Sequence, residues 1–169
     1  MTLVLETTRL RLREFRSDDL AVLAAMFEDA EQMRFYPRKR TRREASEWLR
    51  RNQSLYAKCG FGFWLVEDRA TLEFAGYCGI RPLHLEGAAV TEIGWHTKKT
   101  AWNRGIATEA ATAVRDAAFE RFAQTRLVAL ITPDNGPSRR VADKIGMHEA
   151  HATMFEGVSY LTYVHERGS

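Results

Sequence analysis

The sequence predicts an α/β protein of the α+β kind, whose central sheet is mixed, mostly antiparallel and covered by helices on both faces. Three observations lead to this prediction. Strand-like and helix-like apolar periodicities follow one another in the order β-α-α-β-β-β-α-β-α-β-β. Three successive strand-like segments with short turns are typical of an antiparallel meander. A long helix that leads into a wholly apolar strand indicates a crossover to a parallel neighbour buried on both faces.

The length and composition are those of one globular domain, and we expect a single domain over residues 1–169. The longest apolar stretch, Leu20 to Phe27, is too short to cross a bilayer, and Glu6 stands where a signal peptide needs an apolar run. We therefore expect no membrane association. Cys59 and Cys78 lack CxxC spacing, which predicts free thiols and a cytoplasmic protein.

The N-terminal third is predicted to form one strand and two helices. Residues 9–13 alternate arginine and leucine, as in a strand with one buried face. Ser17 precedes an acidic pair and is expected to cap an amphipathic helix. Thr41 and Glu44 have the spacing of a capping box, which begins a second helix that ends near Cys59.

The middle of the chain is predicted to form the antiparallel meander. Its strands are expected over residues 61–67, 73–83 and 88–97. Turn-forming residues at 68–71 and 86–87 separate these strands.

The last third is predicted to complete the sheet around the crossover helix. The expected elements are a helix over 105–122, a strand over 127–131, a short helix between Pro137 and Gly146, and a hairpin of strands over 148–156 and 158–166.

The clearest functional signal lies where the last strand of the meander leads into the long helix. This segment reads Trp102-Asn103-Arg104-Gly105-Ile106-Ala107-Thr108-Glu109. The first turn of a helix offers unpaired N–H groups and the positive end of the helix dipole, and Gly105 and Ala107 are small enough to let an anion approach. Lys98, Lys99 and Arg104 add positive charge. We interpret the segment as a pyrophosphate cradle. The alternative is an ordinary helix start, because neither a GK(S/T) nor a GxGxxG motif is present.

Three segments of the chain resemble the GNAT acyltransferase superfamily. Residues 102–107 are similar to its (Arg/Gln)-x-x-Gly-x-(Gly/Ala) signature, in the Trp-x-x-Gly-x-Ala-Thr-Glu-Ala form of the Rim-type ribosomal-protein N-terminal acetyltransferases. Residues 135–147 are similar to a second family block, Asn-x-x-Ser-x-Arg-Val-x-x-Lys-x-Gly-Met, and residues 5–13 resemble a Rim-type start. Trp102 replaces the general Arg/Gln, as is usual in the Rim branch. Asn103 departs from the Gly of that branch and places a side chain beside the phosphates.

The resemblance implies transfer of an acetyl group from acetyl-CoA to a primary amine, by direct attack in a ternary complex and without a covalent enzyme nucleophile. Glu92, on the strand expected beside the pantetheine arm, is the candidate general base; the alternative is a strand residue paired with a neighbouring arginine. Ser138 is the candidate donor to the departing sulfur, or only a helix cap.

The resemblance also implies which residues bind acetyl-CoA. Backbone amides around Trp95 are candidates to polarise the thioester carbonyl. Asn135 resembles the family's pantetheine-binding asparagine, with a turn or helix cap as the alternative. The expected acetyl-CoA site comprises Trp95, His96, Thr97, Asn103, Arg104, Gly105, Ile106, Ala107, Thr108 and Asn135.

The acyl acceptor and the oligomeric state, monomer or homodimer, stay open. Acceptors in this superfamily include protein N-termini, lysines, polyamines, amino acids and antibiotics. His148 and His151 form an H-x-x-H pair without a further spaced ligand, so no metal is expected.

A basic segment is the strongest charge feature of the chain. Residues 38–51 hold seven Lys or Arg against Glu44 and Glu47, a local charge of +5. We expect residues Arg38 to Arg43 to attract an acidic or phosphate-rich acceptor. Two other functions compete, namely a nucleic-acid or ribosome-binding module that uses this segment and an acyl-CoA-binding protein without turnover. A solvated helix entrance that pairs with nearby acids is the structural alternative.

Overall fold

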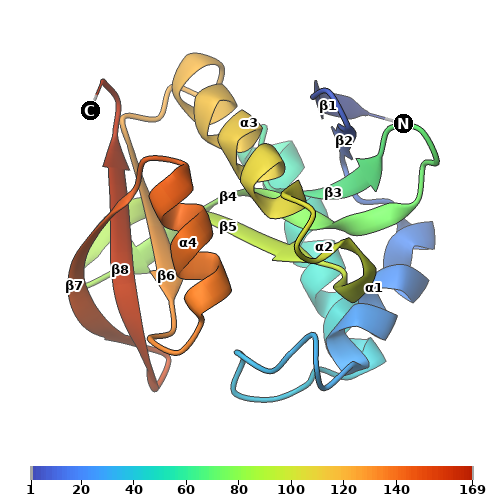
Figure 1. The fold of residues 1–169 in the computed structure, drawn as a ribbon, viewed down its shortest axis with the longest axis horizontal. Coiled ribbons are helices and arrows are strands. Elements are labelled where there is room, and N and C mark those ends of the chain that lie inside the picture. The colour runs from blue at the N-terminus through green and yellow to red at the C-terminus, as the bar shows by residue number, and fades with distance from the viewer. Residues whose placement is uncertain (1, 169) are drawn as a thin grey trace.

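The computed structural model describes residues 2–168, which fold around one eight-stranded sheet in the order β1-β2-β3-β4-β5-β6-β8-β7 (Figure 1). The strands are β1 (Leu3–Glu6), β2 (Leu10–Arg13), β3 (Phe63–Asp68), β4 (Phe74–Leu85), β5 (Ala88–Thr97), β6 (Arg126–Ile131), β7 (His148–Phe155) and β8 (Val158–Glu166). β5 and β6 are parallel, and the other neighbouring strands are antiparallel. The predicted mixed, mostly antiparallel sheet is confirmed.

The helices are α1 (Leu20–Glu28), α2 (Arg42–Cys59), α3 (Ile106–Glu120) and α4 (Gly136–Lys144), with 3-10 turns at Ser17–Asp19 and Lys99–Ala101. Within residues 2–168, none of them combines the length and the apolar character that a membrane crossing requires.

The N-terminal region contains one strand more than predicted. The strand expected at residues 9–13 is β2, and β1 precedes it and pairs with it antiparallel, with Leu5 opposite Leu12. β1 has four residues and lies at the edge of the sheet, where none of its side chains is fully buried. A short edge strand of this kind therefore shows little alternation of apolar and polar residues in the sequence.

The helix starts confirm one predicted cap and correct another. Thr41 and Glu44 form the predicted capping box, in which Glu44 N donates to Thr41 Oγ1 at 3.2 Å and Thr41 N donates to Glu44 Oε2 at 2.8 Å. The prediction that Ser17 caps the first helix is wrong. Ser17 lies inside a 3-10 turn that precedes the helix, in which the Asp19 amide donates to the Arg16 carbonyl oxygen at 3.1 Å and the Arg16 amide donates to Asp19 Oδ2 at 2.7 Å.

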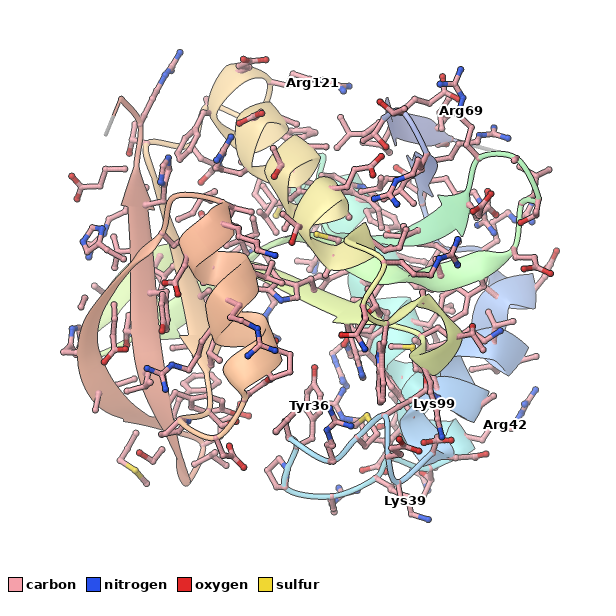
Figure 2. All side chains as sticks on the ribbon, in the orientation of Figure 1. Tyr36, Lys39, Arg42, Arg69, Lys99 and Arg121 are labelled. Atoms are coloured by element: carbon pink, nitrogen blue, oxygen red, sulfur yellow. The ribbon has the colours of Figure 1, made fainter. Side chains whose placement is uncertain are left out.

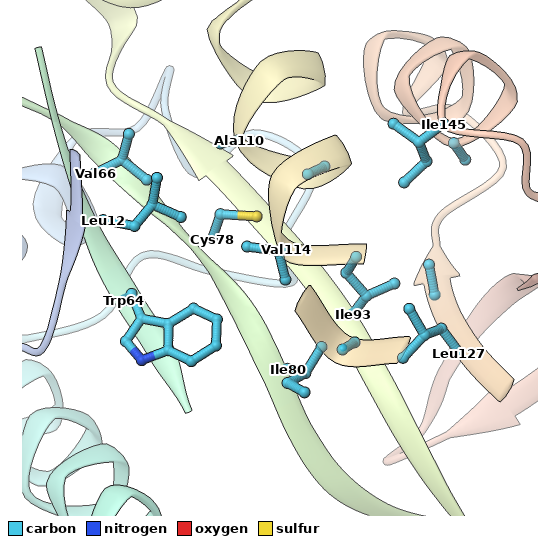
Figure 3. Packing of buried hydrophobic residues seen from close by; sticks show 14 of the residues in the cluster. Leu12, Trp64, Val66, Cys78, Ile80, Ile93, Ala110, Val114, Leu127 and Ile145 are labelled. Carbon is cyan, nitrogen blue, oxygen red and sulfur yellow. The ribbon is translucent and has the colours of Figure 1, made fainter. Parts of the chain in front are cut away.

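The two faces of the sheet bury separate sets of side chains, because successive residues of a strand point to opposite faces. On one face, Trp64 packs in a cluster with α3 residues such as Val114, as Figure 3 shows. On the other face, its neighbour Phe63 packs with Phe27 of α1 and Trp48 of α2. Figure 1 shows α3 and α4 in front of the strands and α2 behind them. The predicted helices on both faces are therefore confirmed.

β5 and β6 separate soon after they meet. Their parallel ladder joins Glu92 to Val128 and holds no second pair within the described residues. Beyond this pair, β5 stays with β4 as far as Thr97, while β6 stays with β8 as far as Ile131. The two halves of the sheet therefore splay apart and leave a wedge between the ends of β5 and β6.

Candidate active site

The wedge opens into a cleft of about 970 Å³. Its walls come from β5 and β6, the first turns of α3 and α4, the loop between α1 and α2, and side chains of α2, β4 and β8. The predicted site residues that line it are Glu92, Trp95, His96, Thr97, Asn103, Gly105, Ile106, Ala107, Thr108, Asn135 and Ser138. Arg104 does not line it. Its side chain is 56% exposed and places Nη2 3.9 Å from Asp68 Oδ2.

The first turn of α3 presents bare backbone to the cleft. Gly105 is the N-cap residue and has a φ of 74°, a left-handed conformation that glycine adopts without strain. Among the described residues, no side chain caps this helix, so its first N–H groups remain available to an anion. Asn103 also has a positive φ, 58°, which asparagine tolerates better than most residues. We call residues 103–108 the α3 cradle.

An arginine near the N-terminus holds the α3 cradle in place. Arg9 donates from Nη1 to the carbonyl oxygen of Arg104 at 2.8 Å and from Nε to Glu109 Oε2 at 2.6 Å. Thr7 Oγ1 donates to the other carboxylate oxygen of Glu109 at 2.5 Å. These bonds join the loop before α3 and its first turn to the start of β2. The sequence interpretation missed this brace, and residues 5–13 together with Glu109 were the signal that could have revealed it.

Lys99, one of the two lysines expected beside the α3 cradle, has another partner. Lys99 forms an ion pair with Glu31, and its backbone N donates to Gln32 Oε1 at 2.8 Å. These contacts attach the 3-10 turn after β5 to the loop between α1 and α2. The charge of Lys99 is therefore already balanced within the protein.

His96 is a buried structural residue of β5. Its Nε2 lies 2.9 Å from the carbonyl oxygen of Gln32, which makes Nε2 the donor because a carbonyl only accepts. Burial lowers the pKa of His96 to about 4. The imidazole is therefore neutral near pH 7, and it links β5 to the loop between α1 and α2, which lines the cleft.

Glu92 combines the two environments that the sequence left open. It forms an ion pair with Arg81 of β4, and it also lines the cleft, with 12% of its side chain exposed. Burial raises the pKa of Glu92 above its ordinary value, although Arg81 acts in the opposite direction. The charge of Glu156 adds to the increase. A carboxylate with a raised pKa in a cleft is suited to accept a proton.

The first turn of α4 and the end of β6 line the same cleft. Asn135 Oδ1 accepts from the backbone N of Ser138 at 3.1 Å and so caps α4. Asn135, rather than Ser138, is therefore the capping residue. Both side chains line the cleft.

The whole arrangement matches a known family. A family model described as an acetyltransferase (GNAT) domain covers residues 9–148 of this chain. The chain belongs to the GNAT acetyltransferase family. It is an acyl-CoA-dependent N-acetyltransferase, and the fold described above is the GNAT fold.

Individual proteins are similar to this chain. The uncharacterized protein YkkB of Bacillus subtilis (strain 168) is 40% identical over 145 residues, which cover 85% of this chain and 84% of YkkB. The acetyltransferase from Agrobacterium tumefaciens str. C58 is 26% identical with a TM-score of 0.85, over 96% of this chain and 94% of that one. RimL, a ribosomal L7/L12 α-N-protein acetyltransferase in complex with coenzyme A, shares the fold with a TM-score of 0.79 over 97% of both chains, at 16% identity.

Some side chains of the basic segment lie on the exterior of the enzyme, and others line the cleft. Arg38 pairs with Glu44 at 2.5 Å and Arg43 pairs with Glu47 at 3.1 Å, as the solvated-entrance alternative expects. Figure 2 shows Lys39 and Arg42 at the periphery, pointing away from the fold. Arg40 differs from these residues because it lines the cleft.

Three tyrosines from distant parts of the sequence meet at one end of the cleft. They are Tyr36 from the loop between α1 and α2, Tyr77 from β4 and Tyr160 from β8. The rings of Tyr36 and Tyr77 both lie against His96, with ring centroids 5.2 Å and 5.6 Å from that of the imidazole. The pKa of Tyr160 is affected by Tyr36 and Glu92. Burial raises the pKa of all three phenols, which are therefore neutral donors near pH 7. We call this part of the cleft the tyrosine end. The sequence interpretation missed it, since no local pattern joins the three residues.

Proposed function

We propose that the enzyme transfers the acetyl group of acetyl-CoA to a primary amine, a protein N-terminus or a small amine, by direct attack in a ternary complex with Glu92 as the general base. The position of Glu92 carries this proposal. It forms the β5–β6 pair beyond which the strands separate, and it lines the same cleft as the α3 cradle. A proton acceptor and a site for the phosphates of coenzyme A therefore share one cavity.

The residues present suit coenzyme A. The free N–H groups of the α3 cradle would hold the pyrophosphate, with Asn103 and Thr108 beside them. The wedge leaves the edges of β5 and β6 unpaired, so the backbone of residues 95–97 offers hydrogen-bonding groups to the amide-bearing pantetheine arm. Asn135 lines the same wall and would contribute its side-chain amide.

The reaction needs two bond changes and one proton acceptor. The amine nitrogen attacks the thioester carbonyl carbon, so that a C–N bond forms while the C–S bond breaks. Glu92 accepts the proton that the nitrogen loses, directly or through a water molecule. The electron pair of the C–S bond leaves with sulfur as the coenzyme A thiolate. Backbone amides around Trp95 stabilise the negative charge on the carbonyl oxygen, and Ser138 donates to the thiolate.

The raised pKa of Glu92 suits this role. An α-amine has a pKa near 8, so a fraction of it is already deprotonated at neutral pH. A carboxylate that is a stronger base than usual takes the remaining proton more readily.

Further features support the setting proposed for the reaction. Residues 102–107 and the RimL-like fold support the Rim branch of the family. A sheet that joins β1 to β8 supports a single catalytic domain over residues 1–169. The free cysteines Cys59 and Cys78 support a reducing, cytoplasmic setting.

A thiol-release assay tests the proposed function. The purified protein is incubated with acetyl-CoA and a panel of amines and N-terminal peptides, and free coenzyme A is measured. We expect amine-dependent release of coenzyme A together with one acetylated product per thiol. Binding of acetyl-CoA without release by any amine would favour the competing acyl-CoA-binding function.

A further inference from the structure

The charge on the walls of the cleft is strongly positive. Among the described residues that line it, seven are Lys or Arg and three are Glu. Two of those carboxylates are balanced within the protein, Glu31 by Lys99 and Glu92 by Arg81. A cavity with this balance attracts anions and repels ligands that carry several positive charges.

Arg40 is the cation that the tyrosine end leaves without an acidic partner. Its backbone N donates to the carbonyl oxygen of Phe27 at 2.9 Å, which positions the residue. Its guanidinium lies 5.1 Å from the ring centroid of Phe27 and 5.9 Å from that of Tyr36. Within residues 2–168, no carboxylate oxygen lies within 4.0 Å of it. Aromatic contacts alone leave the fork of N–H donors of Arg40 largely free.

The charge of Arg40 acts on the tyrosine end. It lowers the pKa of Tyr36, Tyr77 and Tyr160, against the larger effect of burial. The guanidinium lies 5.9 Å from the ring centroid of Tyr36, and Arg40 lines the same cleft as all three phenols. Glu92 also acts on Tyr36 and Tyr160. Glu92 and Arg40, which has no acidic partner, line the same cleft.

The neighbours of Arg40 in the basic segment show that its environment is specific. Arg38 and Arg43 have nearby glutamates, and Arg42 is exposed to water. Arg40 is half-buried, and a half-buried guanidinium without an anion loses hydration with no compensating ion pair. An anionic ligand would restore that balance, and the planar fork of arginine matches a carboxylate or a phosphate.

We propose that the acyl acceptor is a small primary amine that carries its own carboxylate or phosphate, which Arg40 binds while the amine faces Glu92. This inference rests on the proposed function and adds the chemical class of the acceptor. Polyamines and aminoglycosides are poor acceptors, because their additional positive charges meet Arg40 and Arg81. A small acceptor is favoured over an acidic peptide because Arg40, which has no acidic partner, lines the cleft and not the outer surface of the basic segment.

The test compares matched acceptors with the purified full-length protein. Glycine, β-alanine and 4-aminobutyrate are each compared with the corresponding amide, phosphoethanolamine is compared with ethanolamine, and spermidine and an acidic N-terminal peptide complete the set. We expect at least one acid to exceed its neutral partner by about tenfold or more in kcat/KM, mainly through KM. The better of the carboxylate and phosphate series identifies the anion.

Variants of Arg40 link that preference to one side chain. Arg40→Gln is expected to raise the KM of the preferred acid about ten- to a hundredfold, while the KM of the neutral partner and of acetyl-CoA changes little. Arg40→Lys should restore part of the loss. Arg42→Gln removes an equal charge outside the cleft and should change each constant less than about twofold, because exposed charges are screened by salt.

Several results would overturn the proposal. One is that a neutral amine or spermidine is the better acceptor for the wild-type enzyme. Another is that Arg40→Gln keeps the preference for the acid. A third is that the acidic peptide reacts faster than the small acids and that Arg40→Gln does not change its rate. If no amine releases coenzyme A, the proposed function is wrong instead. Calorimetric titration of the same acid and amide into the protein with coenzyme A then decides the inference, since equal binding of both contradicts it.

Discussion

The two ends of the cleft are built in different ways. The α3 cradle consists of backbone N–H groups from one continuous segment, fixed by Arg9 and Glu109. The tyrosine end consists of side chains from the loop between α1 and α2, from β4 and from β8. A site made from one segment leaves a motif in the sequence, whereas a site made from three distant segments does not. A site of the second kind can change its ligand through single side-chain substitutions, because no backbone geometry depends on them.

The largest effect is expected at the junction of the two ends. Glu92→Gln should lower kcat about 10²- to 10⁴-fold with little change in the KM of acetyl-CoA, because only the proton acceptor is lost. The loss should shrink as pH rises, since more of the amine is then already deprotonated. Because burial raises the pKa of Glu92, the wild-type rate should fall with decreasing pH through a pKa above the usual glutamate value. The variant should lack that acidic limb.

A matched substitution controls for the change of charge. Glu73→Gln alters an exposed carboxylate outside the cleft and should leave the pH profile unchanged. The melting temperature of Glu92→Gln should be measured as well, because the variant leaves Arg81 without its partner. A folded Glu92→Gln enzyme with the wild-type rate at pH 7 would exclude Glu92 as the base. The proton acceptor would then lie elsewhere than at the junction of the two ends.

The second effect isolates the α3 cradle. Coenzyme A at 100 times its Kd should stabilise the wild-type protein by about 2.7 kcal/mol, which is several degrees in melting temperature, whereas NAD and ATP should do much less. Ala107→Glu should abolish this shift, because it adds bulk and negative charge where the pyrophosphate binds. Ala113→Glu places the same side chain further along α3 and should retain the shift. Full coenzyme A stabilisation of Ala107→Glu would move the phosphate site elsewhere.

The same contrast between local and distant contacts explains what the sequence could predict of the fold. The bounds of β5 and β8 and the capping box of Thr41 and Glu44 were predicted correctly, because each depends on neighbouring residues. β1 was missed since only its pairing with β2 defines it. The Ser17 cap was wrong because the Asp19 amide donates to the carbonyl oxygen of Arg16, which places Ser17 inside a 3-10 turn.

The candidate site follows the same rule. Gly105 and Ala107 were found from a local motif, and the structure places both in the cleft. The partner of Lys99 is 68 residues away, so nothing near that lysine showed that its charge was already balanced. The segment containing Arg40 was identified by its charge, but which of its arginines faces inward depends on Phe27 and Tyr36.

A smaller effect is expected from the brace of the α3 cradle. Arg9→Gln should weaken coenzyme A binding about three- to tenfold, because it removes the bonds to the Arg104 carbonyl and to Glu109 that position the cradle. The acid preference at the tyrosine end and the pH profile should not change. Arg11→Gln removes a nearby arginine, in β2, and should leave coenzyme A affinity close to that of the wild type. A shift of the pH profile by Arg9→Gln would mean that the two ends are coupled.

The smallest effect is expected at Ser138. Its backbone N, not its hydroxyl, makes the capping bond to Asn135, so Ser138→Ala should leave α4 intact. The hydroxyl can assist only the departure of sulfur, and a thiol with a pKa near 8.5 leaves as the thiolate without a strong acid. We therefore expect a decrease in kcat of less than about threefold, measured by thiol release under saturating acetyl-CoA. A loss comparable to that of Glu92→Gln would show that thiolate departure, rather than proton removal from the amine, limits the reaction.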